Sequence, residues 1–328
     1  MATRRKLVID CDPGNDDAMS ILMALSDVNI DVIAITCVAG NCDVTQASLN
    51  ALRVLQVAKK LDIPVYTGCD APLLGERKPG SPYHGVDGLG DVPDPGAPGI
   101  DRIQIEHGVQ ALLQLSKEHA QPVVQLRTLR ELQLVSIGPL TNVAMAIRLD
   151  SAFGSRLKSC HIMGGNYQGR GNITMAAEFN FYADPEAAFV VLGQLCCPMT
   201  VMPWETCLEH AISWETHTNT RSHDTEKARF IKSVDEWSVN YVKPKNAPNF
   251  VPADEACMAC FLSDDVIKSS VHVYATVETK GHYTSGQMVV DWRKRDVNDP
   301  LYKKPNVTIV TGLHQSLYEQ LMDRALSC

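Results

Sequence analysis

Residues 8–18 decide the fold, and they read Val8-Ile9-Asp10-Cys11-Asp12-Pro13-Gly14-Asn15-Asp16-Asp17-Ala18. The apolar residues at the start belong to a predicted strand over Lys6–Asp12, and Pro13-Gly14 predicts the turn that follows it. Apolar residues at helical spacing then predict a helix over Asp16–Leu25. A buried strand that turns directly into a helix is the first unit expected of an α/β fold.

Strand-like and helix-like segments alternate along the rest of the chain. This alternation predicts an α/β fold with an open, mostly parallel (mixed) sheet and helices on both faces. Strands are predicted at Asp31–Val38, Ile63–Tyr66, Gln133–Ile137, Lys158–Met163, Met199–Met202, Val271–Val277 and Met288–Trp292. Helices are predicted at Thr45–Lys59, 106–118, Thr141–Ile147, Asp184–Leu192, Asp224–Tyr241 and Asp254–Phe261.

Two regions depart from the regular alternation. Residues 75–99 contain seven glycines and are predicted to form a long loop, which in a compact domain is usually functional. Residues 223–250 are predicted to form a helical lid region. No convincing linker interrupts the chain, so we expect residues 1–328 to form a single domain.

The composition limits the classes of function. The 328 residues include 30 Lys and Arg against 38 Asp and Glu, and the formal charge of −8 argues against a nucleic-acid partner. The 45% hydrophobic content excludes a disordered chain. The apolar runs are too short to span a bilayer, and no secretory signal is evident, so we expect a cytoplasmic protein without a membrane partner. The eleven cysteines are then expected to be free thiols.

Four carboxylates lie within eight residues at the first strand-to-helix junction. Packing four negative charges there is unfavourable unless a cation offsets them, and oxygen ligands suit Ca²⁺ or Mg²⁺. Helix capping is an alternative explanation for Asp16 and Asp17, which precede or begin the helix. Capping does not explain Asp10 and Asp12, which lie on the strand before it.

The segment resembles the DxDPGxDDA signature of the inosine-uridine preferring nucleoside hydrolases. The resemblance implies a nucleoside hydrolase-like, Rossmann-related fold and a small-molecule ribonucleoside as the substrate. It also implies a homodimer or homotetramer. Further matching blocks follow in family order at Val38–Asn41, Gly138–Asn142, Met163–Gly165, Gly171–Thr174, Ala177–Asn180, Ala183–Ala187 and Val289–Asp291.

The resemblance also implies roles for individual residues. Ca²⁺ would be bound by the carboxylates of Asp12, Asp17 and Asp254 and by the backbone carbonyl of Thr141, and Asp12 would take a proton from the attacking water. Capping of a helix explains Thr141 as well as metal binding does, and one residue can do both; Asp254 has the character of an N-cap too, and its assignment as a ligand depends on the resemblance alone. The residues expected to hold ribose hydroxyls are Asp16, Asn41, Asn172, Glu178 and Asn180, of which Asn41 is also counted among the catalytic residues.

The chain departs from the family pattern before Asp254. Many members have histidine there, which protonates the leaving base, whereas this chain has Ala253. Tyr241, which falls where the family places a leaving-group tyrosine, and His84 of the glycine-rich loop are the predicted catalytic substitutes. Aromatic stacking on the base is a further option, with Trp237 as a predicted substrate-binding residue and Trp204 as another candidate. Donation by Glu205 or Glu255 is less favoured because a carboxylic acid needs a strongly raised pKa.

These observations predict a Ca²⁺-dependent N-glycosidase that cleaves ribonucleosides into ribose and free base through an oxocarbenium-like transition state. A slight preference for purine ribosides is expected from the missing histidine. One alternative is a weak or inactive nucleoside-binding relative, since Ala253 cannot donate a proton. A less favoured alternative is a phosphatase of the haloacid-dehalogenase type, because Asp10 and Asp12 also end a first strand.

Overall fold

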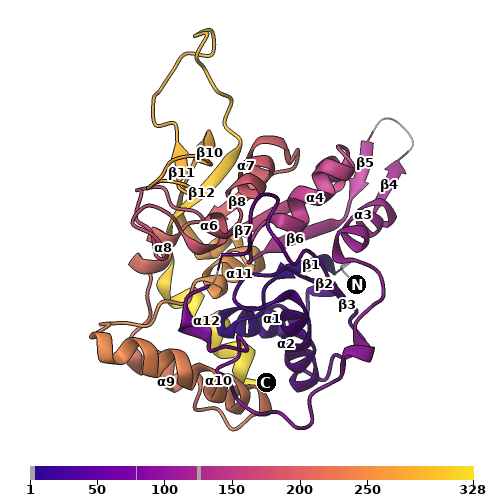
Figure 1. Ribbon diagram of the computed structural model, residues 1–328, viewed down its shortest axis with the longest axis vertical. Helices are drawn as coiled ribbons and strands as arrows, with labels where there is room; N and C mark the ends of the chain where they lie inside the picture. Colours follow the sequence, from indigo (N-terminus) through magenta and orange to yellow (C-terminus); the bar gives the residue numbers. More distant parts are fainter. Residues whose placement is uncertain (1–3, 79, 124–126) are drawn as a thin grey trace.

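The computed structural model describes residues 4–78, 80–123 and 127–328. Its main element is an eight-stranded sheet in the order β3-β2-β1-β6-β7-β8-β12-β9 (Figure 1). All neighbours in it pair in parallel except β12 and β9, which are antiparallel. The predicted open, mixed and mostly parallel sheet is confirmed. The strands of this sheet are β1 (Arg5–Cys11), β2 (Ile30–Cys37), β3 (Val65–Thr67), β6 (Leu132–Ser136), β7 (Ser159–Met163), β8 (Met199–Met202), β12 (Val307–Leu313) and β9 (Ile267–Val273).

The order of the first six strands places a topological switch point between β1 and β6. The chain moves outward from β1 through β2 to β3, then returns to the other side of β1 and continues to β8. Helices that follow two such neighbouring strands diverge to opposite faces, so a crevice opens beyond the strands' carboxyl ends. The residues that leave β1 and β6 therefore come together at this crevice.

Side chains of β1 alternate between the two faces of the sheet, as the pleat requires. Leu7, Ile9 and Cys11 belong to one apolar core, whereas Val8 belongs to the other. Helices cover both faces, as predicted, with α1, α11 and α12 packed together on one face and α3, α4 and α7 on the other. These six helices, with α2, are α1 (Asn15–Ser26), α2 (Val44–Val57), α3 (Gly108–Glu118), α4 (Thr141–Leu149), α7 (Pro185–Gln194), α11 (Asp254–Leu262) and α12 (Gln315–Ser327).

The remaining elements are short, apart from one long helix near the cavity described below. The helices are α5 (Phe153–Arg156), α6 (Phe179–Ala183), α8 (Trp204–Glu209), α9 (Trp214–Thr220) and α10 (Glu226–Val242), with 3-10 turns η1 (Pro82–His84), η2 (Ile100–Arg102), η3 (Lys243–Lys245) and η4 (Asp264–Val266). Two small sheets pair β4 (Ala120–Val123) with β5 (Arg127–Arg130) and β10 (Ala275–Val277) with β11 (Met288–Val290). No helix within the described ranges is both long and apolar enough to cross a membrane.

The predicted elements are found within a few residues of their expected bounds, with one correction. The single strand predicted over Val271–Val277 is wrong, because the chain leaves the main sheet after Val273 and enters the small sheet at Ala275. Asn306 fixes this crossing, since its side chain hydrogen-bonds both the N–H and the carbonyl of Ala275 at 2.8 and 2.9 Å. The sequence reading did not anticipate β12, α12 or the β4–β5 hairpin.

The glycine-rich loop is attached to α10, and this attachment shapes the cavity described next. The Trp237 indole N–H donates to the Pro82 carbonyl at 2.7 Å. Asn15, the first residue of α1, donates through its side chain to the Val234 carbonyl at 2.8 Å. Gly90 has a positive φ of 69°, and a Cβ there would collide with the same Val234 carbonyl. The glycine-rich loop, α1 and α10 are therefore joined, and together they form one wall of the cavity.

Candidate active site

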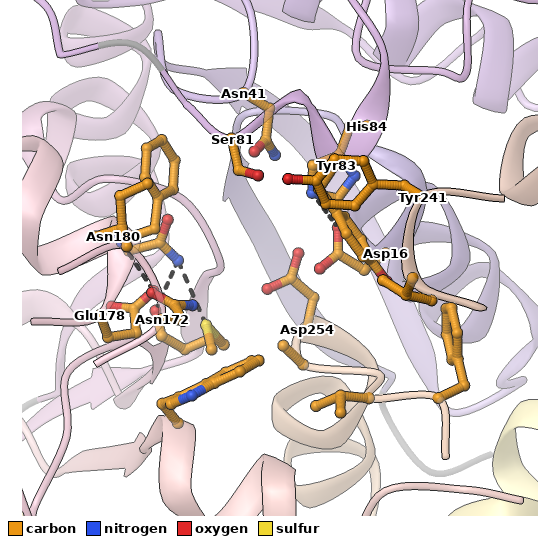
Figure 2. Close-up of a pocket in the computed structure, with 18 of the residues that line it drawn as sticks. Asp16, Asn41, Ser81, Tyr83, His84, Asn172, Glu178, Asn180, Tyr241 and Asp254 are labelled. Atoms are coloured by element: carbon orange, nitrogen blue, oxygen red, sulfur yellow. Dashed lines mark hydrogen bonds and ion pairs between the residues drawn. The ribbon is translucent and has the colours of Figure 1, made fainter. Parts of the chain in front are cut away.

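A cavity of about 420 Å³ lies beyond the carboxyl ends of the central strands, which is large enough for a small organic ligand. Residues far apart in the sequence, from Asp12 to Asp254, line it (Figure 2). In Figure 2, Asn172, Glu178 and Asn180 form one side, while Asp16 and Tyr241 lie on the other. The predicted site residues that line this cavity are Asp12, Asp16, Asn41, His84, Asn172, Glu178, Asn180, Tyr241 and Asp254.

The Asp12 carboxylate is held between two glycine backbones. Its Oδ2 accepts the Asn41 backbone N–H at 2.8 Å. A Cβ at Gly138 would lie 2.5 Å from Oδ1, and one at Gly40 would overlap Oδ2. Both glycines are therefore required for the carboxylate to occupy this position, since any side chain would displace it. Asp12 is 1% exposed, so it is both buried and fixed in direction.

Asp17 and Asp254 complete a cluster of buried acids beside Asp12. Asp17 accepts backbone N–H bonds from Gly14 at 2.8 Å and from Asp12 at 3.3 Å. One carboxylate oxygen each of Asp16, Asp17 and Asp254 lies within 4.8 Å of the others. The family resemblance implied Asp12, Asp17 and Asp254, whereas this set of three contains Asp16 in place of Asp12. Asp12 lies next to the set, because its backbone N–H donates to the Asp17 carboxylate.

The cluster lacks a protein cation. Burial raises the pKa of Asp12, Asp17 and Asp254 well above the usual range, and repulsion between neighbouring acids raises it further. Among the ion pairs of the described residues, none joins a lysine or arginine to any of these three. Buried carboxylates without a partner are the donor set of a hard divalent cation, so the residues present fit such an ion.

Thr141 does not line the cavity, and its predicted role as a metal ligand through the backbone carbonyl stays a prediction. Thr141 is the first residue of α4, and its hydroxyl donates to Asp184 at 2.7 Å on the side away from the cavity. Ile137, at the carboxyl end of β6, lines the cavity instead. Its carbonyl accepts the Asn180 side-chain N–H at 3.1 Å, so a backbone oxygen is available there.

Glu178 and Asn180 form the opposite wall, and each is fixed by backbone groups. Glu178 Oε1 accepts the Asn180 N–H at 2.8 Å, and Oε2 accepts the Gly165 N–H at 2.8 Å. Burial raises the pKa of Glu178 to about 7 against the effect of these hydrogen bonds. The Asn180 amide donates to the carbonyls of Ile137 and Met163, both at 3.1 Å, which leaves its Oδ1 to accept from a ligand.

Asn172 belongs to a loop that Glu205 holds in place. Glu205 is fully buried, and its two oxygens accept the backbone N–H groups of Tyr167, Gln168 and Arg170 at 2.9 to 3.1 Å. These bonds use the carboxylate as an acceptor, which does not suit the proton-donor role that was considered for Glu205. Its role is to support the loop that carries Asn172.

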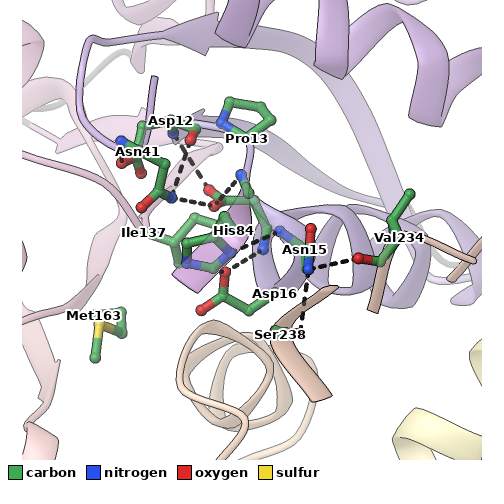
Figure 3. Close-up of polar contacts among 12 residues, drawn as sticks. Asp12, Pro13, Asn15, Asp16, Asn41, His84, Ile137, Met163, Val234 and Ser238 are labelled. Atoms are coloured by element: carbon green, nitrogen blue, oxygen red, sulfur yellow. Dashed lines mark hydrogen bonds and ion pairs between the residues drawn. The ribbon is translucent and has the colours of Figure 1, made fainter. Parts of the chain in front are cut away.

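His84 faces Asp16 at the edge of the acid cluster (Figure 3). Its Nδ1 accepts the Asn15 backbone N–H at 3.2 Å, which places the ring proton on Nε2, 3.7 Å from an Asp16 oxygen. Burial lowers the pKa of His84. The imidazolium form needs a proton on Nδ1 and would lose the bond from Asn15. In this geometry His84 is a neutral donor that contacts Asp16, which does not favour the predicted role as the acid for the leaving base.

The other end of the cavity is lined by aromatic side chains from the loop and from α10. The Tyr83 and Tyr241 rings meet edge to face, with their centroids 6.2 Å apart. Trp204 and Phe250 are further aromatic residues in the lining of the cavity. The structure does not bring Trp237 to the cavity, because its indole is directed to the Pro82 carbonyl and the side chain lies outside the lining. The prediction that Trp237 binds substrate is therefore not supported by its position.

Asp10 lies behind the site and does not face it. Its carboxylate accepts hydrogen bonds from Thr36 at 2.6 Å, Asn142 at 2.8 Å and Ser136 at 3.3 Å. Burial raises its pKa to about 6 despite these bonds. The phosphatase alternative required the first aspartate of the strand to attack a substrate, and a fully buried, fully bonded Asp10 is not available for that chemistry.

Some residues of the cavity were missed by sequence reasoning. Ile137 contributes a carbonyl, which carries no side-chain signal, although its place directly before Gly138 at a strand end was available. Tyr83, next to the predicted His84, and Lys245, beyond the predicted helix, also line the cavity. Their positions depend on how the loop and α10 pack together.

A doubly wound α/β sheet with an acid-lined cavity at its switch point defines a class of proteins that bind small polar ligands there. The inosine-uridine preferring nucleoside hydrolase family matches residues 7–320 of the chain. The chain belongs to this family, which confirms the predicted family and the predicted class of enzyme, an N-glycosidase.

Three relatives show how far the likeness extends. The inosine-uridine preferring nucleoside hydrolase of Crithidia fasciculata is 30% identical over 88% of each chain. The pyrimidine-specific ribonucleoside hydrolase RihA of Escherichia coli strain K12 is 33% identical over 97% of each chain. The solved structure of an inosine-guanosine nucleoside hydrolase has a TM-score of 0.89 at 30% identity, over 99% of each chain. The relatives differ in the bases that their names specify.

Proposed function

We propose that this protein hydrolyses the N-glycosidic bond of ribonucleosides, releasing ribose and the free base, with Ca²⁺ as its cofactor. The observation that carries the proposal is the convergence of Asp12, Asp254 and Glu178 with the amides of Asn41 and Asn180 in one cavity at the switch point. Family membership supports the reaction class.

The charges and amides of the cavity suit the chemistry of this bond. Cleavage of an N-glycosidic bond places positive charge on the ribose, and a pre-arranged set of carboxylates stabilises that charge. Asn41, Asn172 and Asn180 offer amide donors and acceptors for ribose hydroxyls. Asp16, beside His84, is a further acceptor on the opposite wall. We propose that these residues and Glu178 bind the ribose.

Asp12, Asp17 and Asp254 would hold the Ca²⁺ ion, with the Ile137 carbonyl as the backbone oxygen in place of Thr141. A bound divalent cation of this kind lowers the pKa of a coordinated water and orients ribose hydroxyls. Asp12 is the base that takes the proton from the attacking water, because its carboxylate is fixed by the Asn41 N–H and faces the cavity.

At the other end, we propose that the aromatic lining favours a purine base. Tyr83, Trp204, Tyr241 and Phe250 provide flat apolar surfaces on which a two-ring base can stack. Ala253 has no proton to donate to the leaving base, so another group must do this. Tyr241, predicted as a catalytic residue from the sequence, lines the cavity with its hydroxyl-bearing side chain and is the candidate that we propose.

The test is a panel of purine and pyrimidine ribosides, assayed for free base before and after treatment with a chelator. We expect release of base from inosine and guanosine, loss of activity on chelation, and recovery when Ca²⁺ is restored. Turnover that survives complete removal of divalent ions would refute the cofactor assignment. Absence of release from every riboside would refute the enzymatic proposal.

A second function is favoured by one observation, the alanine at position 253. A relative that cannot activate the leaving base would bind ribosides without turning them over. Isothermal titration calorimetry beside the base-release assay separates the two. Binding of inosine in the presence of Ca²⁺ without any release of hypoxanthine would support the binding protein over the hydrolase.

A further inference from the structure

Acidic side chains prevail in the lining of the cavity, and Lys245 contributes a positive charge beside Tyr241. Among the cavity-lining residues in the described parts of the chain, Lys245 is the one lysine or arginine. The carboxylates are spread around the cavity: Glu178 lies on one side of it, and Asp16 lies on the same side as Tyr241 (Figure 2). A substrate in the cavity would therefore meet several negative charges and, beside Tyr241, one positive charge.

Lys245 contacts Tyr241, one of the two tyrosines that line the cavity. Its Nζ lies 3.3 Å from the centroid of the Tyr241 ring, which is within the range of a cation–π contact. The polar groups of Lys245 and, to a lesser extent, of Ser81 lower the pKa of the Tyr241 hydroxyl. Tyr241 and Ser81 both line the cavity, so the three side chains form a polar group at its base end.

The turn that carries Lys245 is held on both sides. It follows α10 as a 3-10 turn, begins with Lys243 and Pro244, and closes at Asn246 with a left-handed φ of 56°. The next residue, Ala247, accepts the Trp214 indole N–H at 2.9 Å. These contacts determine which way each lysine of the turn faces.

Neighbouring Lys243 provides an internal comparison. Its Nζ lies 4.9 Å from the Trp214 ring centroid, and the residue does not line the cavity. The two lysines belong to the same short turn and carry the same charge, yet only Lys245 faces Tyr241. A general effect of positive charge on this surface can therefore be separated from an effect at the cavity.

Breaking the glycosidic bond creates a need for a cation at this end. The electron pair of the C–N bond goes to the base, which becomes negative unless it is protonated. Ala253 has no proton to give, and His84 is a neutral donor engaged with Asp16. Tyr241 can supply the proton from its hydroxyl, which leaves a negative phenolate oxygen beside Lys245.

We infer that Lys245 stabilises the negative charge that forms on the Tyr241 oxygen as Tyr241 protonates the leaving base. The inference rests on the proposed hydrolysis of ribonucleosides. The attacking water gives its proton to Asp12, the Tyr241 proton moves to a nitrogen of the base, and solvent restores the tyrosine at the exposed rim. Lys245 acts through Tyr241 and is a positioning residue.

The experiment compares two leaving groups in the Ca²⁺-loaded, full-length protein. Inosine releases a base that needs a proton, whereas p-nitrophenyl β-D-ribofuranoside releases a phenolate that does not. We expect Lys245→Met to lower kcat on inosine by about 10- to 100-fold, the range of a weakened general acid, and to change kcat on the nitrophenyl riboside less than about twofold. Lys245→Arg should restore most of the activity on inosine, because it keeps the charge.

Lys243→Met is the matched control and should leave both rates within about twofold of the wild-type values. An equal loss on both substrates in Lys245→Met would overturn the inference, since it would mean a structural effect on the site. Unchanged turnover of inosine would overturn it as well. Both outcomes leave the proposed hydrolase intact, whereas a wild-type protein that cleaves neither substrate would remove the proposed function itself.

Discussion

The two ends of the cavity are built in different ways. At the ribose end, Asp12 and Glu178 are buried, and backbone N–H groups fix their carboxylates. At the base end, Tyr241 is half-buried and Lys245 is exposed on a short turn after α10. Groups that are held by strand ends are pre-organised for one geometry, whereas groups on a loop and a turn can change without disturbing the sheet.

The difference explains how one fold serves relatives with different bases. The relatives reported above include one described as pyrimidine-specific and another described as an inosine-guanosine hydrolase. Under the proposed function, relatives whose names specify different bases would need a different lining at the base end only. Substitutions at the ribose end should therefore cost far more activity than those at the base end.

The largest effect is expected for Asp12→Asn. The change removes the proposed base and one ligand of the ion, and it places an amide N–H near the Asn41 backbone N–H. We expect kcat/KM on inosine to fall by about 10³-fold or more, the order associated with general bases and metal-activated water. Calorimetry should show weakened Ca²⁺ binding in the same variant.

Asp43→Asn is the control for that experiment. Asp43 caps α2 through a 2.9 Å bond from the Gln46 N–H, is exposed, and lies two residues beyond Asn41. Asparagine is an equally good cap, so activity should stay close to the wild-type value. If Asp12→Asn retained a comparable rate, the ribose end would not be the catalytic end of the cavity.

A somewhat smaller effect is expected for Glu178→Gln. Both carboxylate oxygens accept backbone N–H groups, from Asn180, Gly165 and Phe181. An amide must turn its NH₂ group toward one of these donors, which loses a hydrogen bond and leaves a buried N–H unpaired. We expect kcat/KM to fall by about 10²-fold and the free energy of unfolding to fall by about 1–3 kcal/mol. Urea titration beside steady-state kinetics measures both.

The same residue predicts a pH dependence of stability. The pKa of Glu178 is about 7 in the folded protein against an ordinary value of 4.5. Between these values the folded protein keeps a proton that the unfolded chain has lost, so the contribution is full below pH 4.5 and declines as the pH rises to 7. The gap in unfolding free energy between wild type and Glu178→Gln should narrow by about 1–3 kcal/mol over that range. A constant gap would contradict the raised pKa.

The ribose end was also the more predictable end from sequence. Residues 8–18 place Asp12 and Asp17 at a strand-to-helix junction, and strand ends of a parallel sheet meet in space. The sequence offered Thr141 for the backbone ligand, whereas the cavity-lining carbonyl that we propose for this role belongs to Ile137, and a carbonyl has no side-chain signature. The predictions of a single domain and of a homo-oligomer remain predictions.

The base end could not be predicted in the same way. Its lining depends on how residues 75–99 pack against α10, which is tertiary information. Trp237 and Tyr241 are four residues apart on one helix and were both expected to face a base. The structure separates them, because a carbonyl of the loop accepts the Trp237 indole while Tyr241 faces the cavity.

At the base end, Ala253→His should increase activity. Ala253 immediately precedes α11 and lines the cavity, so an imidazole there would face the space proposed for the base. If protonation of the leaving base limits the rate, turnover of uridine should rise by about tenfold, at the low end for an added general acid. Hydrolysis of the nitrophenyl riboside should not change. A variant with unaltered uridine turnover would indicate that ribose chemistry, at the other end, limits the rate.

The smallest effect is expected for Trp237→Phe, which tests the corrected position of this residue. Trp237 is 39% exposed, and its one polar contact is the 2.7 Å bond from Nε1 to the Pro82 carbonyl. Phenylalanine keeps much of the packing and loses that bond, so the loop should be attached less firmly at a cost of about 1 kcal/mol. We expect KM for inosine to rise by about two- to threefold at constant kcat, whereas Trp204→Phe, inside the cavity, should have the larger effect on KM. A larger effect on KM in Trp237→Phe than in Trp204→Phe would mean that Trp237 contacts the base when substrate is bound.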